Sequence, residues 1–136
     1  MSLDIYLESD ETEAHTCSCG DKHQRKIRPD FELNLTHNLT AMANKTNPSL
    51  YLLMWRPEDQ PKYRYVSSDV EGFKVKCELL INDLELAIKD LESRPEYFKQ
   101  FNPINGWGSY SGLLCEAKRF LQACKLNSEA NVIVSR

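Results

Sequence analysis

Hydrophobic and polar residues alternate at the start of the chain in a pattern that predicts a β-strand. Leu3, Ile5 and Leu7 are separated by polar or amphipathic residues, and this period of two is typical of a strand with one buried face. The chain ends in ANVIVSR (130–136), a β-branched run that favours a second strand. A terminal strand is ordered only when it is tied to a neighbour, so we expect these two strands to pair in one small sheet.

A largely polar segment, residues 9–30, follows the first strand and predicts a hairpin that protrudes from the body. The chain turns near Gly20-Asp21 and returns through HQRKI (23–27). Pro29 has no backbone N–H, so it should end the ladder or lie at an edge. We therefore expect a single domain, residues 1–136, with residues 9–30 as a hairpin arm.

Short helices are expected next. THNLTAMANK (36–45) predicts a short helix with Thr36 as its N-cap, and SLYLLMW (49–55) predicts a second one. The stretch QPKYRYVSS (60–68) has no clear period, and we expect it to be irregular. Further on, RPEYFKQF (94–101) predicts one helical turn, and NPINGWGSY (102–110) is typical of a loop.

Two long amphipathic helices dominate the remaining chain. The first runs from about Ser68 to Ser93, where Ser68 and Glu71 fit a capping box, and the second ends at Asn127-Ser128. The apolar residues spaced three or four apart are Val70, Phe73, Cys77, Leu80, Ile81, Leu84, Ala87, Ile88 and Leu91 in the first helix and Leu113, Leu114, Ala117, Phe120, Leu121 and Cys124 in the second. The pattern predicts an α+β fold, in which a small, mainly antiparallel sheet packs against two long helices with shorter helices at one end.

The composition adds limits on function. Hydrophobic residues make up 41% of the chain and charged residues 27%, as in ordinary soluble globular proteins. A formal net charge of −3 provides no strong cationic field, so nucleic-acid binding is disfavoured, although Lys22, Arg25, Lys26 and Arg28 form a local basic cluster. No apolar run approaches the roughly 20 residues that cross a bilayer, and the start lacks the features of a signal peptide. We expect a cytosolic protein with no membrane contact; the sequence leaves its oligomeric state open.

The chain contains five cysteines, an odd number that leaves at least one thiol unpaired. In a reducing cytosol we expect no structural disulfides. Cys77, Cys115 and Cys124 occupy apolar helix positions and are interpreted as small core residues.

The segment HTCSCGDKH (15–23) is a candidate metal site. His15, Cys17, Cys19 and His23 would supply a tetrahedral His2Cys2 set of the kind that zinc prefers. Two observations oppose it: residues two apart on a strand have Cα atoms about 6.5–7 Å apart, and Cys-x-Cys is not the usual zinc spacing. The alternative is an exposed hairpin tip that carries thiols. We expect the protein to require no cofactor, with zinc as the one candidate.

Five residues at polar turns are candidates for a ligand site: His37, Asn38, Arg56, Trp107 and Tyr110. His37 and Asn38 follow a helix cap, where free backbone N–H groups favour an anion, and Arg56 could bind a carboxylate or a phosphate. Trp107 and Tyr110 lie near glycines and could stack on a flat ring. The structural alternatives are simple capping, a surface salt bridge, and aromatic side chains that fill the core.

Several short pieces of the sequence resemble a known family. They are MSLDIYL, THNL followed by MA, WRPE, RPEYFKQFNPINGWGSY, ACK and the terminal VSR, and the likeness is strongest from Arg94 to Tyr110. Together they are similar to small uncharacterised proteins encoded by tailed bacteriophages and prophages. The resemblance implies a phage accessory protein made in the cytoplasm of a bacterial host, and it assigns no site residues.

These observations lead to three hypotheses about function. No nucleophile elbow, P-loop, dinucleotide fingerprint or H-E-x-x-H motif is present, so enzymatic activity is disfavoured. The leading hypothesis is non-enzymatic sequestration of a small anionic, nucleotide-like ligand, such as a host-defence signal, at the five candidate residues. The alternatives are a protein-interaction module that uses the arm to inhibit a host factor, and a nucleotide-processing enzyme.

Overall fold

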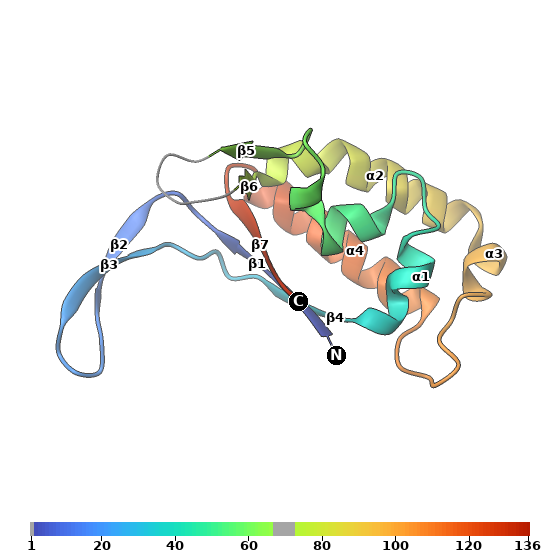
Figure 1. Ribbon diagram of the computed structural model, residues 1–136, viewed down its shortest axis with the longest axis horizontal. Coiled ribbons are helices and arrows are strands. Elements are labelled where there is room, and N and C mark those ends of the chain that lie inside the picture. Colours follow the sequence, from blue (N-terminus) through green and yellow to red (C-terminus); the bar gives the residue numbers. More distant parts are fainter. Residues whose placement is uncertain (1, 67–72) are drawn as a thin grey trace.

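A three-stranded antiparallel sheet lies at the centre of the computed structural model, which describes residues 2–66 and 73–136 (Figure 1). Its strand order is β4-β1-β7, with β1 spanning Ser2–Glu8, β4 spanning Glu32–Thr36 and β7 spanning Asn131–Ser135. The predicted pairing of the first and last strands is confirmed, because Ile5 lies opposite Val134 and Leu7 opposite Val132. The predicted α+β class is also confirmed.

The two faces of the sheet differ in polarity as the period of two predicts. Leu3, Ile5 and Leu7 are fully buried, and Leu33 and Leu35 of β4 join them in the core. The opposite face carries mainly polar or amphipathic side chains that are half-buried or exposed, apart from the half-buried Ile133 and the buried Asn131. The sheet therefore has one face in the core and one toward solvent, which is common for antiparallel sheets.

Two 17-residue helices complete the core, α2 (Cys77–Ser93) and α4 (Tyr110–Leu126). The side chains that they bury in the core are Cys77, Leu80, Leu84, Ala87, Ile88 and Leu91 of α2 and Tyr110, Leu113, Ala117, Phe120, Ala123 and Cys124 of α4. Their spacing of three and four residues explains why each helix presents one apolar face.

The predicted start of the first long helix is wrong. Residues Phe73–Val75 form strand β6, which pairs with β5 (Arg64–Val66), and the helix begins only at Cys77. Lys76 bridges to Asn131, and the Cys77 backbone N–H donates to the Ala130 carbonyl (2.9 Å), so this segment joins the start of β7 instead of coiling. The stretch expected to be irregular therefore contains a strand, and the proposed capping box at Ser68 and Glu71 lies outside the described residues.

Short helical elements follow β4 and α2. Thr36 caps η1 (His37–Leu39), because its hydroxyl oxygen accepts a hydrogen bond from the Asn38 backbone, and α1 (Thr40–Ala43) continues from it. The second predicted short helix is a π-helical turn, η2 (Tyr51–Trp55), followed by the 3-10 turn η3 (Pro57–Asp59). The turn expected after α2 is α3 (Pro95–Lys99).

The polar segment between β1 and β4 forms the predicted hairpin, which extends away from the helices in Figure 1. Its strands are β2 (Thr12–Thr16) and β3 (Lys22–Lys26), paired antiparallel with His15 opposite His23. No side chain of either strand is buried. We call residues 9–30 the arm.

The cysteines depart from expectation at two places. Cys77 and Cys124 lie in the core as predicted, but Cys115 is exposed, since it falls on the solvent side of α4 between the buried positions Leu113 and Ala117. Cys17 and Cys19 form a disulfide, so the expectation of no disulfide is wrong. The chain reverses direction at these residues, and this brings their side chains together. Among the described residues, no helix is long and apolar enough to span a membrane.

Candidate functional site

The loop between α3 and α4 is held in place by its own side chains. Asn102 accepts a hydrogen bond from the Tyr110 backbone (2.8 Å), and Asn105 accepts one from the Trp107 backbone (2.9 Å). Gly108 has a φ of 107°, and a Cβ atom there would lie 2.9 Å from side-chain atoms of Leu39 and Thr36. Only glycine allows this close approach. The loop therefore contacts η1, which lies about 70 residues earlier in the chain.

A pocket of about 480 Å³ lies where this loop meets the sheet. It is lined by Ser2, Asn34, Thr36, Asn38 and Trp107, which come from β1, β4, η1 and the loop. The Trp107 side chain is 70% exposed. Segments that are about 70 residues apart in the chain thus form one small site, which we call the Trp107 pocket.

Two of the five predicted ligand residues, Asn38 and Trp107, line this pocket. Tyr110 is buried, and its hydroxyl donates to the Leu91 carbonyl (2.8 Å). The His37 ring accepts a hydrogen bond at Nδ1 from the Trp55 indole (3.1 Å). Arg56 lies 3.8 Å from Asp59, and its pKa is raised, mainly through a hydrogen bond with Tyr51.

The charge of the Trp107 pocket differs from the sequence expectation. Within the described part of the chain, its lining residues include no charged side chain, and one of them, Asn34, donates from Nδ2 to Asp4 Oδ1 (2.6 Å). The Asn38 carboxamide makes no hydrogen bond to any described side chain or backbone group. The walls are neutral hydrogen-bonding groups beside an exposed indole, a combination that suits a polar ring better than a phosphate.

A second pocket, of about 520 Å³, lies on the solvent face of the sheet where the arm leaves it. Arg28 spans this region, with its guanidinium 4.6 Å from the centre of the Tyr6 ring and its Nε 3.5 Å from a Glu8 carboxylate oxygen. Sequence reasoning missed this pocket, although the outward positions of the first strand were a usable signal. Arg28 already has an acidic and an aromatic partner, and the other charged residues of the lining, Asp4, Asp30 and Glu32, are acidic. The pocket is therefore unfavourable for an anionic ligand.

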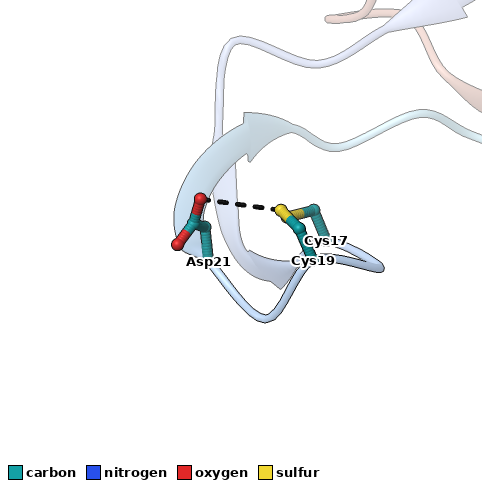
Figure 2. The surroundings of a disulfide bond; sticks show 3 residues. All are labelled: Cys17, Cys19 and Asp21. Atoms are coloured by element: carbon teal, nitrogen blue, oxygen red, sulfur yellow. Dashed lines mark hydrogen bonds between the residues drawn. A yellow bond between two sulfur atoms is a disulfide. The ribbon is translucent and has the colours of Figure 1, made fainter.

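The tip of the arm gathers chemically reactive side chains on one face (Figure 2). The sulfurs of the Cys17–Cys19 disulfide and an oxygen of Asp21 all lie within 4.8 Å of one another, and Cys19 Sγ is 3.5 Å from Asp21 Oδ2. His15 and His23 face each other two residue pairs further along the ladder, with ring centres 5.0 Å apart. Asp21 was missed by the sequence prediction, although its place directly after the Gly20 turn sets it opposite Cys17.

The four predicted metal ligands, His15, Cys17, Cys19 and His23, are thus all at the tip, but as two neighbouring groups. The two sulfurs form a cluster with Asp21, and the two imidazoles form a pair. In the disulfide form the sulfurs are not thiolates, and zinc binds the thiolate.

Comparisons with protein-family models, with curated proteins and with solved structures found no match.

Proposed function

We propose that this protein is a non-catalytic binding module for a small molecule with a flat, polar ring of the nucleobase type, held in the Trp107 pocket. The observation that carries the proposal is the exposed Trp107 indole on a fixed loop, next to the amide and hydroxyl side chains of Asn38 and Thr36. In the phage setting that the sequence resemblance implies, such a module would act by sequestering a nucleotide-like signal of host defence.

Stacking on the indole would be the main apolar contribution to binding. Trp107 presents its apolar ring to water, while the only other tryptophan, Trp55, is buried. A base stacked on an aromatic side chain contributes about 1–3 kcal/mol, and the contact is favourable because both ring faces leave water. The loop loses little freedom on binding, since Asn102, Asn105 and Gly108 already fix its conformation.

Hydrogen bonds from the walls would set the orientation of the ring. A carboxamide offers two donors and an acceptor, which matches the mixed edge of a nucleobase, and Asn38 has all of them available among the described residues. The Thr36 hydroxyl uses its oxygen to accept from the Asn38 backbone (3.2 Å), so its own proton can still be donated. Ser2, which lies opposite Thr36 in the sheet, adds a further hydroxyl.

The phosphate of a nucleotide would contribute little. The pocket walls are neutral, and Arg56, the cation expected to bind it, already contacts Asp59 and Tyr51. We therefore propose the ring, instead of the anionic group named in the sequence hypothesis, as the recognised part. A tenfold difference in affinity corresponds to about 1.4 kcal/mol of binding free energy, and a phosphate without a cationic partner should contribute less than that. A nucleoside and its monophosphate should therefore bind within about threefold of each other.

Isothermal calorimetry with a panel of nucleosides and nucleotides tests this proposal. We expect at least one nucleobase to bind, with affinity insensitive to added salt and reduced at least tenfold by Trp107→Ala. Ile104→Ala is the matched control, because Ile104 is fully exposed in the same loop and does not line the pocket. Absence of heat from the whole panel, or equal binding by Trp107→Ala and the wild type, would contradict the proposal.

The non-catalytic part of the proposal needs a separate measurement. The ligand recovered after long incubation with the protein should be chemically unchanged by chromatography. Conversion of the ligand that is lost in Trp107→Ala would replace a binding module with a nucleotide-processing enzyme.

A further inference from the structure

We propose that the tip of the arm is a reduction-dependent binding site for a thiophilic divalent cation of the zinc type. Its ligands are the Cys17 and Cys19 thiolates, the Asp21 carboxylate and one imidazole of the His15–His23 pair. The site shares no residue with the Trp107 pocket, so it stands or falls independently of the proposed function.

The first support is the convergence of three donor atoms. The two sulfurs and an Asp21 oxygen already lie within 4.8 Å of one another. Ligand atoms on one tetrahedral zinc ion are separated by roughly 3.3–3.8 Å, given metal–ligand bonds of about 2.0–2.3 Å. After reduction the two sulfurs must therefore move apart to this separation while the Asp21 oxygen approaches them, shifts on the order of 1–2 Å that an exposed turn permits.

The main sequence objection to a metal site does not apply to this backbone. It assumed strand spacing between Cys17 and Cys19, but β2 ends at Thr16 and the two Cα atoms are 5.4 Å apart. The chain reverses through Ser18 and Gly20, and the Gly20 φ of 91° is one that glycine adopts readily. The turn thus brings both sulfurs to the same side.

The histidine pair lies outside this set of three donors, two residues further along the ladder, and one imidazole would turn toward the sulfurs to supply the fourth ligand. In an antiparallel ladder, side chains at alternate positions share a face, so positions 13, 15 and 17 of the outgoing chain match positions 25, 23 and 21 of the returning chain. His15 and His23 therefore lie on the same face as Cys17 and Asp21. His15 and Cys17 are also half-buried, whereas Ala14 and Thr16 of the other face are exposed.

The disulfide makes metal binding depend on reduction. To open it, a dithiol of the cell gives two electrons and two protons to the S–S bond and becomes a disulfide itself. In vitro a phosphine gives the two electrons and takes up oxygen from water to become the phosphine oxide, while that water supplies the two protons. Either route breaks the S–S bond and forms two thiols. Binding then releases both thiol protons as two sulfur–metal bonds form. The oxidised tip has no thiolate and so cannot bind in this way. The tip is exposed at the end of the arm, where a reductant can reach it.

Cobalt(II) titration followed by zinc competition tests the site in a Cys115→Ser background, in which the two cysteines outside the tip, Cys77 and Cys124, are buried. After phosphine reduction we expect one equivalent of cobalt, sulfur-to-cobalt charge-transfer absorption, and displacement by zinc. The oxidised protein should show none of these. Cys17→Ser and Cys19→Ser should abolish the absorption, while Asp21→Asn and the double variant His15→Gln/His23→Gln should each weaken binding at least tenfold.

Ser18→Ala is the matched control, because Ser18 lies between the cysteines and is not a proposed ligand. Its affinity should equal that of the parent protein, and circular dichroism should show every variant folded. Binding of less than one-tenth equivalent of zinc by the reduced protein would overturn the proposal, as would equal binding by the oxidised and reduced forms.

Discussion

Single residues decide which of the candidate side chains can meet a ligand. For Trp107 the sequence left a core aromatic and a ligand-stacking aromatic equally open, because glycines flank it in either case. The structure exposes 70% of its side chain, whereas Tyr110, three residues later, is buried. The difference follows from position: Tyr110 begins α4 and faces its packed side, while Trp107 belongs to a loop whose backbone supplies its own hydrogen bonds.

Gly108 gives the sharpest prediction at this scale. Gly108→Ala should destabilise the protein more than Gly106→Ala and abolish ligand binding, because its Cβ would meet Leu39 and Thr36 at 2.9 Å and displace the loop. Gly106 has a φ of 76° and no described atom within 4 Å of the position that a Cβ would take. Its substitution should therefore lower the free energy of unfolding by only about 1–2 kcal/mol, the cost of a left-handed backbone at a non-glycine residue. Urea denaturation and calorimetry of both variants measure the difference. Equal losses of stability would show that the contact with η1 is unimportant.

Secondary-structure elements were predictable where one period was dominant. The alternation at 3, 5 and 7 and the helical spacing across 80–91 each fit a single pattern, and both elements were confirmed. The start of α2 was misplaced because apolar residues at 73, 75 and 77 fit a strand, while 73, 77 and 80 fit a helix. The bridge between Lys76 and Asn131 and the hydrogen bond from the Cys77 backbone to the Ala130 carbonyl favour the strand. These long-range contacts cannot be predicted from the local sequence.

Attachment of the arm to the body depends on Asp10. Its carboxylate accepts hydrogen bonds from Lys76 (2.8 Å), Asn131 (2.8 Å) and Lys74 (3.1 Å), which join the arm to β6 and β7. The hydrogen bond from Lys76 and then that from Asn131 are the main causes that hold the pKa of Asp10 well below its usual range.

A carboxylate with a lowered folded-state pKa stabilises the fold above its unfolded-state pKa, about 3.9, and loses that contribution as the pH falls toward the lower folded-state value. The free energy of unfolding of Asp10→Asn should therefore be lower than that of the wild type at pH 7, and this difference should narrow steadily below about pH 4. Urea denaturation at several pH values measures it, with Asp30→Asn as an exposed control on the same arm. A gap that is the same at pH 7 and pH 3 would contradict this role.

At the scale of the whole molecule, the two chain ends close the fold. β1 lies between β4 and β7, so the last strand completes a sheet that the first strand begins. Arg136 adds a hydrogen bond to the Trp55 carbonyl (2.6 Å) and an ion pair with Glu58 (2.6 Å). The sequence predicted this closure correctly from strand pairing, but the meeting of residues 2, 38 and 107 in one pocket depends on packing that no local pattern reports.

Deletion of residues 131–136 should therefore abolish cooperative unfolding. Burial of a valine contributes about 1.5–3 kcal/mol, so loss of Val132 together with a five-residue ladder approaches the 5–15 kcal/mol of a typical domain. Replacement of residues 12–26 by an Asn-Gly turn is the matched control, because β2 and β3 bury no side chain, and it should keep a cooperative transition. Differential scanning calorimetry distinguishes the two. A folded truncation would show that β7 is dispensable.

Binding of a flat polar ring in the Trp107 pocket can be followed through the two indole N–H signals in a ¹H–¹⁵N NMR titration with nucleosides. Trp107 is exposed at the pocket and Trp55 is buried in the core, so each signal reports one environment. We predict that the Trp107 signal shifts in a saturable way while the Trp55 signal stays in place. Saturable binding that leaves the Trp107 signal unmoved would contradict the account.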